Sequence, residues 1–206
     1  MTLYLCSMAI GIPIDQQPLT QRARSLLITH GQLLFVLGHQ FPWLNSAERN
    51  SSINETLKYL RRRGVPFDKS ELGTGRGNRV YYYFEQIVDV CMATTLVTIM
   101  DISDVAWYLK EYKKELHDIY RSIAERPSDW TNVYKDDPLS SPVIHINMSR
   151  IGSSRSAIAP EVVTIKQLME QVPVVDFFRP IVMIHRLVVM AVGNAEQAPL
   201  ITPGPK

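Results

Sequence analysis

The sequence has few cysteines and no long, uninterrupted hydrophobic run. Its two cysteines, Cys6 and Cys91, stand far apart, which excludes a disulfide framework and a paired-thiol metal motif. The most apolar stretch, Val172 to Val192, is interrupted by prolines and charged residues, so we do not expect it to span a membrane. The segment from Met1 to Ile14 lacks the basic region and cleavage pattern of a secretory signal. We therefore expect a cytoplasmic protein without a membrane partner.

The sequence also lacks the spacings that catalytic and metal sites require. Its five histidines have no metal-ligand spacing with Cys, Asp or Glu. Gly73, Gly75 and Gly77 precede a β-branched and aromatic run instead of a helix, which disfavours a nucleotide-binding loop. Ser, His and Asp are scattered without a nucleophile-elbow pattern. We expect no enzyme, no catalytic residue, no metal site and no cofactor.

Positive charge is concentrated in one segment of the chain. The composition is that of an ordinary globular protein, with 46% hydrophobic and 20% charged residues and a net charge of +2. Between Ser46 and Val80, however, eight Lys and Arg residues stand against four acids. This local surplus exceeds the charge of the whole chain, so an electrostatic argument for a polyanionic partner depends on this segment.

Two helices are expected around the start of that segment. Apolar residues from Pro18 to Leu37 follow the spacing of one amphipathic helix, and Gly38 to Asn50 is expected to be a loop. Ser52 begins a capping-box sequence, which predicts a second helix from there to Gly64 with its Leu57 face buried.

The remaining elements are expected in the following order. Glu71 to Phe84 predicts a hairpin with a Gly-rich, basic tip, because a β-branched and aromatic run follows the glycines. One helix is expected from Glu85 to about Met100, and a longer one from about Ser103 to Arg126. Val143 to Ile151 alternates like a strand, and Thr164 begins a second capping box. The apolar segment after Pro173 fits either helix or buried strand.

Two short motifs resemble the MerR family of transcriptional regulators. Thr56-Leu57-Lys58-Tyr59 and Arg61-Arg62-Arg63-Gly64-Val65-Pro66 resemble the family's Thr-Leu-Arg-Tyr-Tyr-Glu helix and the Gly-Leu pair that begins its wing. Gly77-Asn78-Arg79-Val80-Tyr81 resembles its wing-closing Gly-Tyr-Arg-x-Tyr. The resemblance covers about residues 52–120. The sequence departs from the family at Lys58, at Leu60 and near Met100, where the usual glycine is missing.

The resemblance and the charges together predict a DNA interface. Helical geometry places Lys58, Arg61 and Arg62 on one face, which we expect to enter the major groove. The complete set of predicted DNA-binding residues is Lys58, Tyr59, Arg61, Arg62, Arg63, Arg76, Asn78 and Arg79. The alternative is that the arginine run is only a solvated helix end, stabilised by the helix dipole.

A second pattern predicts self-association. Apolar residues recur at coiled-coil spacing over nearly three heptads, at Val105, Leu109, Tyr112, Leu116, Ile119 and Ile123. In the MerR family such a helix pairs antiparallel across a dimer. The alternative is a helix that packs on its own domain, because a coil this short has little independent stability.

These expectations give a mostly α, α+β protein: a winged helix-turn-helix with a β-hairpin wing, a long dimerisation helix and a C-terminal extension. The expected regions are 1–51 (arm and helix), 52–102 (winged helix), 103–126 (dimerisation helix), 127–197 (effector or interaction region) and 198–206 (disordered tail). The expected function is that of a homodimeric regulator that binds double-stranded DNA, with a small-molecule or protein effector on its C-terminal region. The alternative is an α-rich protein–protein interaction or scaffold protein that uses the same apolar faces and does not bind DNA.

Overall fold

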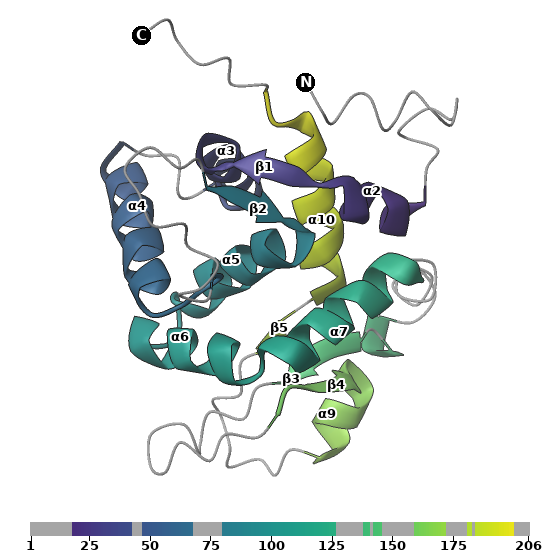
Figure 1. The fold of residues 1–206 in the computed structure, drawn as a ribbon. Coiled ribbons are helices and arrows are strands. Elements are labelled where there is room, and N and C mark those ends of the chain that lie inside the picture. Colours follow the sequence, from purple (N-terminus) through teal and green to yellow (C-terminus); the bar gives the residue numbers. More distant parts are fainter. Residues whose placement is uncertain are drawn as a thin grey trace, which may run out of the picture. The chain divides into compact units, whose positions relative to one another are not determined.

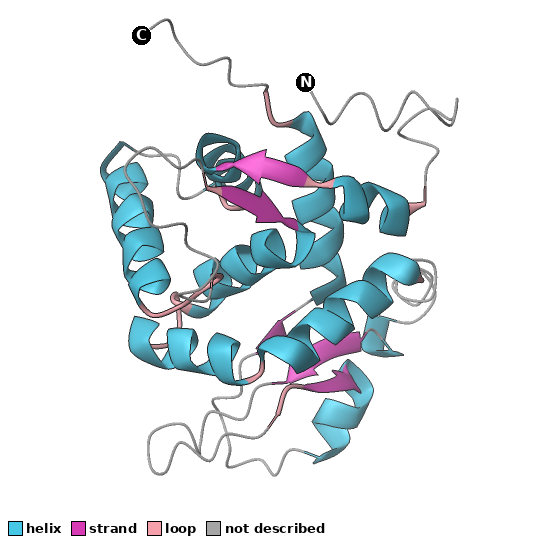
Figure 2. Cartoon of the chain, viewed as in Figure 1, coloured by secondary structure: helices cyan, strands magenta, loops and turns pink. Residues whose placement is uncertain are grey.

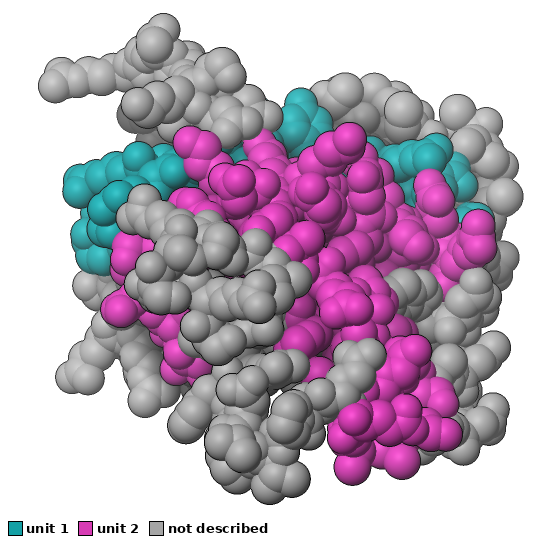
Figure 3. All heavy atoms as spheres, turned by 90° about the horizontal axis from the view of Figure 1, so that it is seen from below, with its two compact units in different colours: residues 1–91, 189–206 teal, residues 92–188 magenta. Residues whose placement is uncertain are grey.

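A computed structural model gives the fold (Figure 1) and describes residues 18–42, 47–67, 80–126, 138–140, 142–145, 159–171, 181–182 and 184–199. The described part is mostly helical, with two small antiparallel sheets (Figure 2), which confirms the predicted mainly α fold with some β-structure. The chain divides into two compact units, residues 1–91 with 189–206 and residues 92–188 (Figure 3). The divisions fall within α5 (Phe84–Leu96) and α10 (Ile184–Gln197).

The described part of the first unit starts with three short elements where one helix was predicted. These are α2 (Leu19–Ser25), β1 (Leu27–Thr29) and α3 (His30–Gln40), so the single helix expected from Pro18 to Leu37 is wrong. The backbone N–H of Gln32 donates to the Thr29 side chain, and the Thr29 N–H donates to Gln32 Oε1 at 2.9 Å. This capping box starts a new helix at His30, and the apolar spacing alone did not reveal it.

Helix α4 (Ala47–Arg62) begins five residues before the expected start, so the predicted loop from Gly38 to Asn50 is too long at both ends. The segment Ala47-Glu48-Arg49 consists of good helix formers, which extend the helix upstream of Ser52. The predicted end is confirmed, because Gly64 has a positive φ of 89°, a conformation that favours glycine. The predicted buried face is also confirmed, with Leu57 and Leu60 buried.

A two-stranded sheet joins distant parts of the first unit. Strand β2 (Tyr81–Tyr83) pairs antiparallel with β1, with Ile28 opposite Tyr82, and α3 contacts both strands. Tyr82 is buried while Tyr81 and Tyr83 are exposed, as strand alternation requires. The predicted strand and the helix that follows it, α5, are therefore confirmed. The predicted Gly-rich tip lies outside the described residues.

An ion pair links α2 to α10 within the first unit. Arg22 Nε donates to Glu196 Oε1 at 2.7 Å, and Arg22 Nη2 contacts the other carboxylate oxygen. Both side chains are partly buried, and this bidentate contact fixes the end of α10 against the start of the described chain.

The second unit contains two helices where one long helix was predicted. Helices α6 (Ile102–Glu111) and α7 (Lys113–Glu125) are separated by Tyr112, whose φ of −105° and ψ of 25° depart from helical values. The continuous helix expected from Ser103 to Arg126 is therefore wrong. The sequence carries neither Gly nor Pro near the break, and the heptad spacing runs through it unchanged.

The described part of the second unit also contains a small sheet with a helix packed on it. Strand β3 (Pro142–His145) lies between β4 (Glu161–Thr164) and β5 (Ile181–Val182) and is antiparallel to both. The turn η3 (Pro138–Ser140) and both β3 and β4 contact α9 (Ile165–Gln171). The second predicted capping box is confirmed, because the Gln167 N–H donates to Thr164 Oγ1 at 3.1 Å and the Thr164 N–H donates to Gln167 Oε1 at 2.9 Å. The segment after Pro173 includes both strand and helix, β5 and α10.

Candidate nucleic-acid interface

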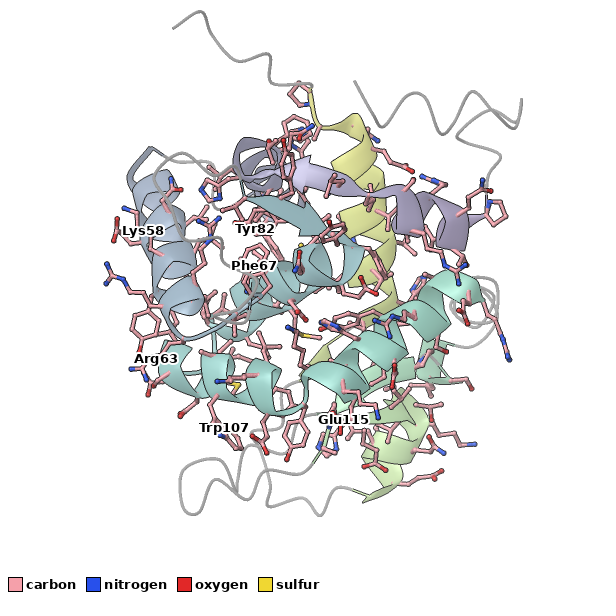
Figure 4. All side chains as sticks on the ribbon, in the orientation of Figure 1. Lys58, Arg63, Phe67, Tyr82, Trp107 and Glu115 are labelled. Atoms are coloured by element: carbon pink, nitrogen blue, oxygen red, sulfur yellow. The ribbon has the colours of Figure 1, made fainter. Side chains whose placement is uncertain are left out.

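The outward face of α4 presents the basic side chains of the described part of the charged segment. Lys58, Arg62 and Arg63 are exposed, on the side opposite the buried Leu57 and Leu60. Figure 4 shows Lys58 and Arg63 pointing away from the unit, while Phe67 and Tyr82 lie on the inner side of α4. We call Lys58, Tyr59, Arg62 and Arg63 the α4 basic stripe. Residues three or four apart on a helix share a face, which is why these side chains form one continuous strip.

An aromatic ring orients one cation of the stripe. The guanidinium carbon of Arg63 lies 5.2 Å from the ring centroid of Tyr59, one helical turn earlier. The guanidinium lies over the face of the ring, and no carboxylate of the described residues pairs with it, so its N–H groups can donate to another acceptor. Arg63 is therefore held at the end of α4 in a form suited to a phosphate group.

One acid offsets part of the charge of the stripe. Lys58 Nζ donates to Glu55 Oε1 at 2.6 Å, and both side chains remain well exposed. The hydrogen bond and charge of Lys58, followed by the charge of Arg62, lower the pKa of the Glu55 carboxyl. Exposed pairs of this kind are weak and screened by salt. A phosphate can therefore compete with Glu55 for Lys58.

Arg61, which was predicted to face the groove, points inward instead. Its Nη2 lies 3.1 Å from His30 Nδ1, and its guanidinium carbon lies 5.4 Å from the ring centroid of Tyr82. Burial lowers the pKa of Arg61, and its Nε is buried with no hydrogen-bond partner among the described residues. The error has a geometric reason: Arg61 follows the buried Leu57 by one turn, so it lies at the boundary of the two faces.

Sequence reasoning missed the partners of Arg61. His30 Nδ1 lies 3.3 Å from the Tyr82 hydroxyl, and His30 Nε2 lies 3.3 Å from Asn54 Oδ1. The rings of His30 and Tyr82 are stacked at 6.3 Å. Because these residues come from α3, α4 and β2, their proximity depends on the pairing of β1 with β2, for which the local sequence carries no signal.

The other predicted DNA contacts cannot be placed on this surface. Arg76, Asn78 and Arg79 lie outside the described residues. Among the described residues, the candidate interface therefore consists of α4 and the adjoining Arg63, and the wing contacts stay predictions.

The predicted dimerisation seam is largely covered by its own chain. Val105, Leu109, Leu116 and Ile123 are at most 2% exposed in the single chain, while Tyr112 and Ile119 are partly exposed. The break at Tyr112 also removes the straight helix that a coiled coil needs. The heptad spacing thus marks a face buried within the chain, which is the alternative that the pattern left open.

Two further features bear on the class of site. Among the described residues, no three His, Cys, Asp or Glu side chains are grouped so that they could bind a metal ion. None of the described helices combines the length and apolar character that crossing a membrane requires.

The comparisons with known proteins do not add to this geometry. No protein-family model matches the chain, and neither a curated protein nor a solved structure matches it. The case for a DNA interface therefore depends on the α4 basic stripe and on the two motifs that resemble the MerR family.

Proposed function

We propose that the protein is a DNA-binding transcriptional regulator of MerR-like winged-helix type, and that the α4 basic stripe contacts double-stranded DNA. The observation that carries this proposal is the separation of faces on α4: Leu57 and Leu60 are buried, while Lys58, Arg62 and Arg63 are exposed. Such a helix can lie against an anionic surface without exposing apolar residues.

The dimensions of α4 suit the major groove. An α-helix with its side chains is about 10–12 Å across, and the major groove of B-DNA is about 12 Å wide. Lys and Arg contacts to phosphates supply most of the non-specific affinity, and a side chain that reaches a base edge adds specificity. In this proposal Arg62 takes the groove-facing role, since Arg61 is engaged with His30 and Tyr82.

The order of elements in the first unit supports the winged-helix part of the proposal. Helices α3 and α4 follow each other, and β2 then returns to pair with β1, beside α3. The second strand of a wing follows the loop at its tip, and β2 likewise follows a basic, Gly-rich segment. The wing itself belongs to the proposal.

A homodimer that reads two half-sites is also part of the proposal, as is an effector site on residues 127–197. Because the seam is largely buried, the interface of this dimer has to use a different surface. The spacing of the half-sites follows from that surface.

The competing function, a scaffold without DNA binding, is less well supported. It requires the apolar faces of the helices to bind a partner. Those faces are buried within the chain at Leu57, Leu60, Leu109 and Leu116. Among the described residues, the exposed side chains of α4 are Glu55, Lys58 and Arg62, and the exposed Arg63 follows them, so positive charge predominates and favours an anionic partner over an apolar one.

A duplex-binding titration with charge-matched variants tests the proposal. We expect the wild-type protein to bind a random-sequence duplex at low salt, as measured by fluorescence anisotropy, and to lose affinity steeply as salt rises. Replacing Arg62 and Arg63 with alanine should weaken binding and reduce the slope of log affinity against log salt by about 0.9 for each phosphate that is no longer neutralised.

The matched control replaces Lys110 and Lys114, two exposed lysines of α6 and α7, with alanine. It removes the same charge from a surface that has no part in the proposal, so it should preserve the slope. Absence of duplex binding by the wild type at low salt would reject the proposal. Equal reductions of the slope in both double variants would show that net charge, and not the α4 basic stripe, is responsible.

A further inference from the structure

We propose that His30 and Arg61 form a proton-controlled latch: neutral His30 holds Arg61 against Tyr82, and protonated His30 releases it toward the α4 basic stripe. The latch regulates the proposed DNA site, so its effect on DNA binding rests on the proposed function. The existence of the latch in the free protein does not depend on that function.

The hydrogen bonds define the resting state of the latch. Arg61 Nη2 lies 3.1 Å from His30 Nδ1, and since a guanidinium can only donate, Nδ1 must be the acceptor. The proton of the neutral ring is therefore on Nε2, which donates to Asn54 Oδ1 at 3.3 Å. The Tyr82 hydroxyl, 3.3 Å from Nδ1, can share the same lone pair. All three contacts are consistent with this one tautomer.

Protonation breaks one of these contacts selectively. A proton taken from solvent onto Nδ1 turns the acceptor into a donor, so Arg61 and His30 become two facing donors of like charge. The contact to Tyr82 survives, because its hydroxyl oxygen can accept from Nδ1, and the contact to Asn54 is unchanged. Of the three partners, only Arg61 is expelled.

The surroundings of His30 keep the ring neutral near pH 7. Among the described residues, the charged or titratable groups that contact it are Arg61 from α4 and Tyr82 from β2. Burial, followed by the charge of Arg61, lowers the pKa of His30 below the ordinary 6.5. His30 is also the first residue of α3, where the helix dipole disfavours a positive charge. Acidification below pH 6.5 is therefore needed to open the latch.

Arg61 is positioned to leave. Its Nε is buried without a hydrogen-bond partner among the described residues, and burial disfavours its charged form. It stands beside Arg62 at the boundary between the buried and exposed faces of α4. A change of side-chain rotamer alone would therefore add its guanidinium to the α4 basic stripe.

The test is an NMR pH titration of the free protein, from about pH 8 to about pH 5, that follows the His30 ring and the Arg61 Nε–Hε group. We expect both signals to change with one shared midpoint, below 6.5. Arg61→Gln should raise the His30 midpoint toward 6.5, and His30→Gln should make the Arg61 signal independent of pH. The control, His39→Gln, replaces an exposed histidine on the same helix and should leave the shared transition intact.

An Arg61 signal that stays unchanged while wild-type His30 titrates would overturn the latch, and this result needs no variant to fold. Duplex titrations then address the consequence. At acid pH the salt slope of the wild type and of His39→Gln should become steeper by about 0.9, and that of Arg61→Gln should not. Coupled NMR transitions without duplex binding at any pH would support the latch and reject the proposed function.

Discussion

The α4 basic stripe and the α6–α7 seam are both helical patterns that the sequence shows clearly, yet the fold uses them in opposite ways. The stripe keeps Lys58, Arg62 and Arg63 in solvent, whereas the seam buries Val105, Leu109, Leu116 and Ile123 within the chain. Apolar periodicity indicates that a face will be covered, but it does not say whether the cover is a second copy or the same chain. Charge at helical spacing is a better guide to exposure, because charged side chains are rarely buried, but it failed at the edge of the face, where Arg61 turns inward.

The largest effect is expected in the seam. Leu116 is fully buried, so Leu116→Ala should lower the free energy of unfolding by about 2–5 kcal/mol, because apolar burial is reduced and a cavity forms. Urea unfolding measures this, with oligomeric state followed by light scattering. The contrast between the stripe and the seam would fail if Leu116→Ala converted a dimer into monomers and left the free energy of unfolding of each chain unchanged. That result would return the seam to its predicted role as a dimer interface.

A smaller effect is expected where the seam reaches the surface. Ile119 is partly exposed, so Ile119→Ala removes less buried apolar area, and the free energy of unfolding should fall by about 1 kcal/mol. The same urea measurement applies. A decrease as large as that of Leu116→Ala would show that Ile119 is covered by a partner in solution.

The smallest effect on stability is expected in the stripe. Replacing Arg62 and Arg63 with alanine should leave the melting temperature close to that of the wild type, because exposed side chains away from the core contribute little. Thermal unfolding checks this alongside the duplex titrations. A clear drop in melting temperature would mean that the stripe stabilises the fold, and its proposed role would lose its main support.

Much of the fold could be predicted where local chemistry decides the structure. The Thr164 capping box, the Gly64 helix end, the aromatic strand at Tyr81–Tyr83 and the buried Leu57 face each depend on neighbouring residues and were predicted correctly. The mainly helical class follows from the same signals.

The remainder depends on contacts between distant segments. Strand β1 forms because β2 pairs with it. The segment from Pro18 to Leu37, whose apolar residues have helical spacing, therefore forms parts of three elements instead of one helix. The inward turn of Arg61 requires His30 and Tyr82, which are brought together by that same pairing. The break at Tyr112 has no local signal either. Each case is one in which tertiary structure overrides a periodic pattern.

Hydrogen–deuterium exchange of the protein, with and without a DNA duplex, tests the central claim most directly. Duplex DNA that binds the α4 basic stripe should slow amide exchange in α4 and its Arg63 end, because the bound helix opens less often. Exchange in α6 and α7 should stay the same. Slower exchange confined to α6 and α7, with α4 unaffected in the presence of bound duplex, would contradict the account.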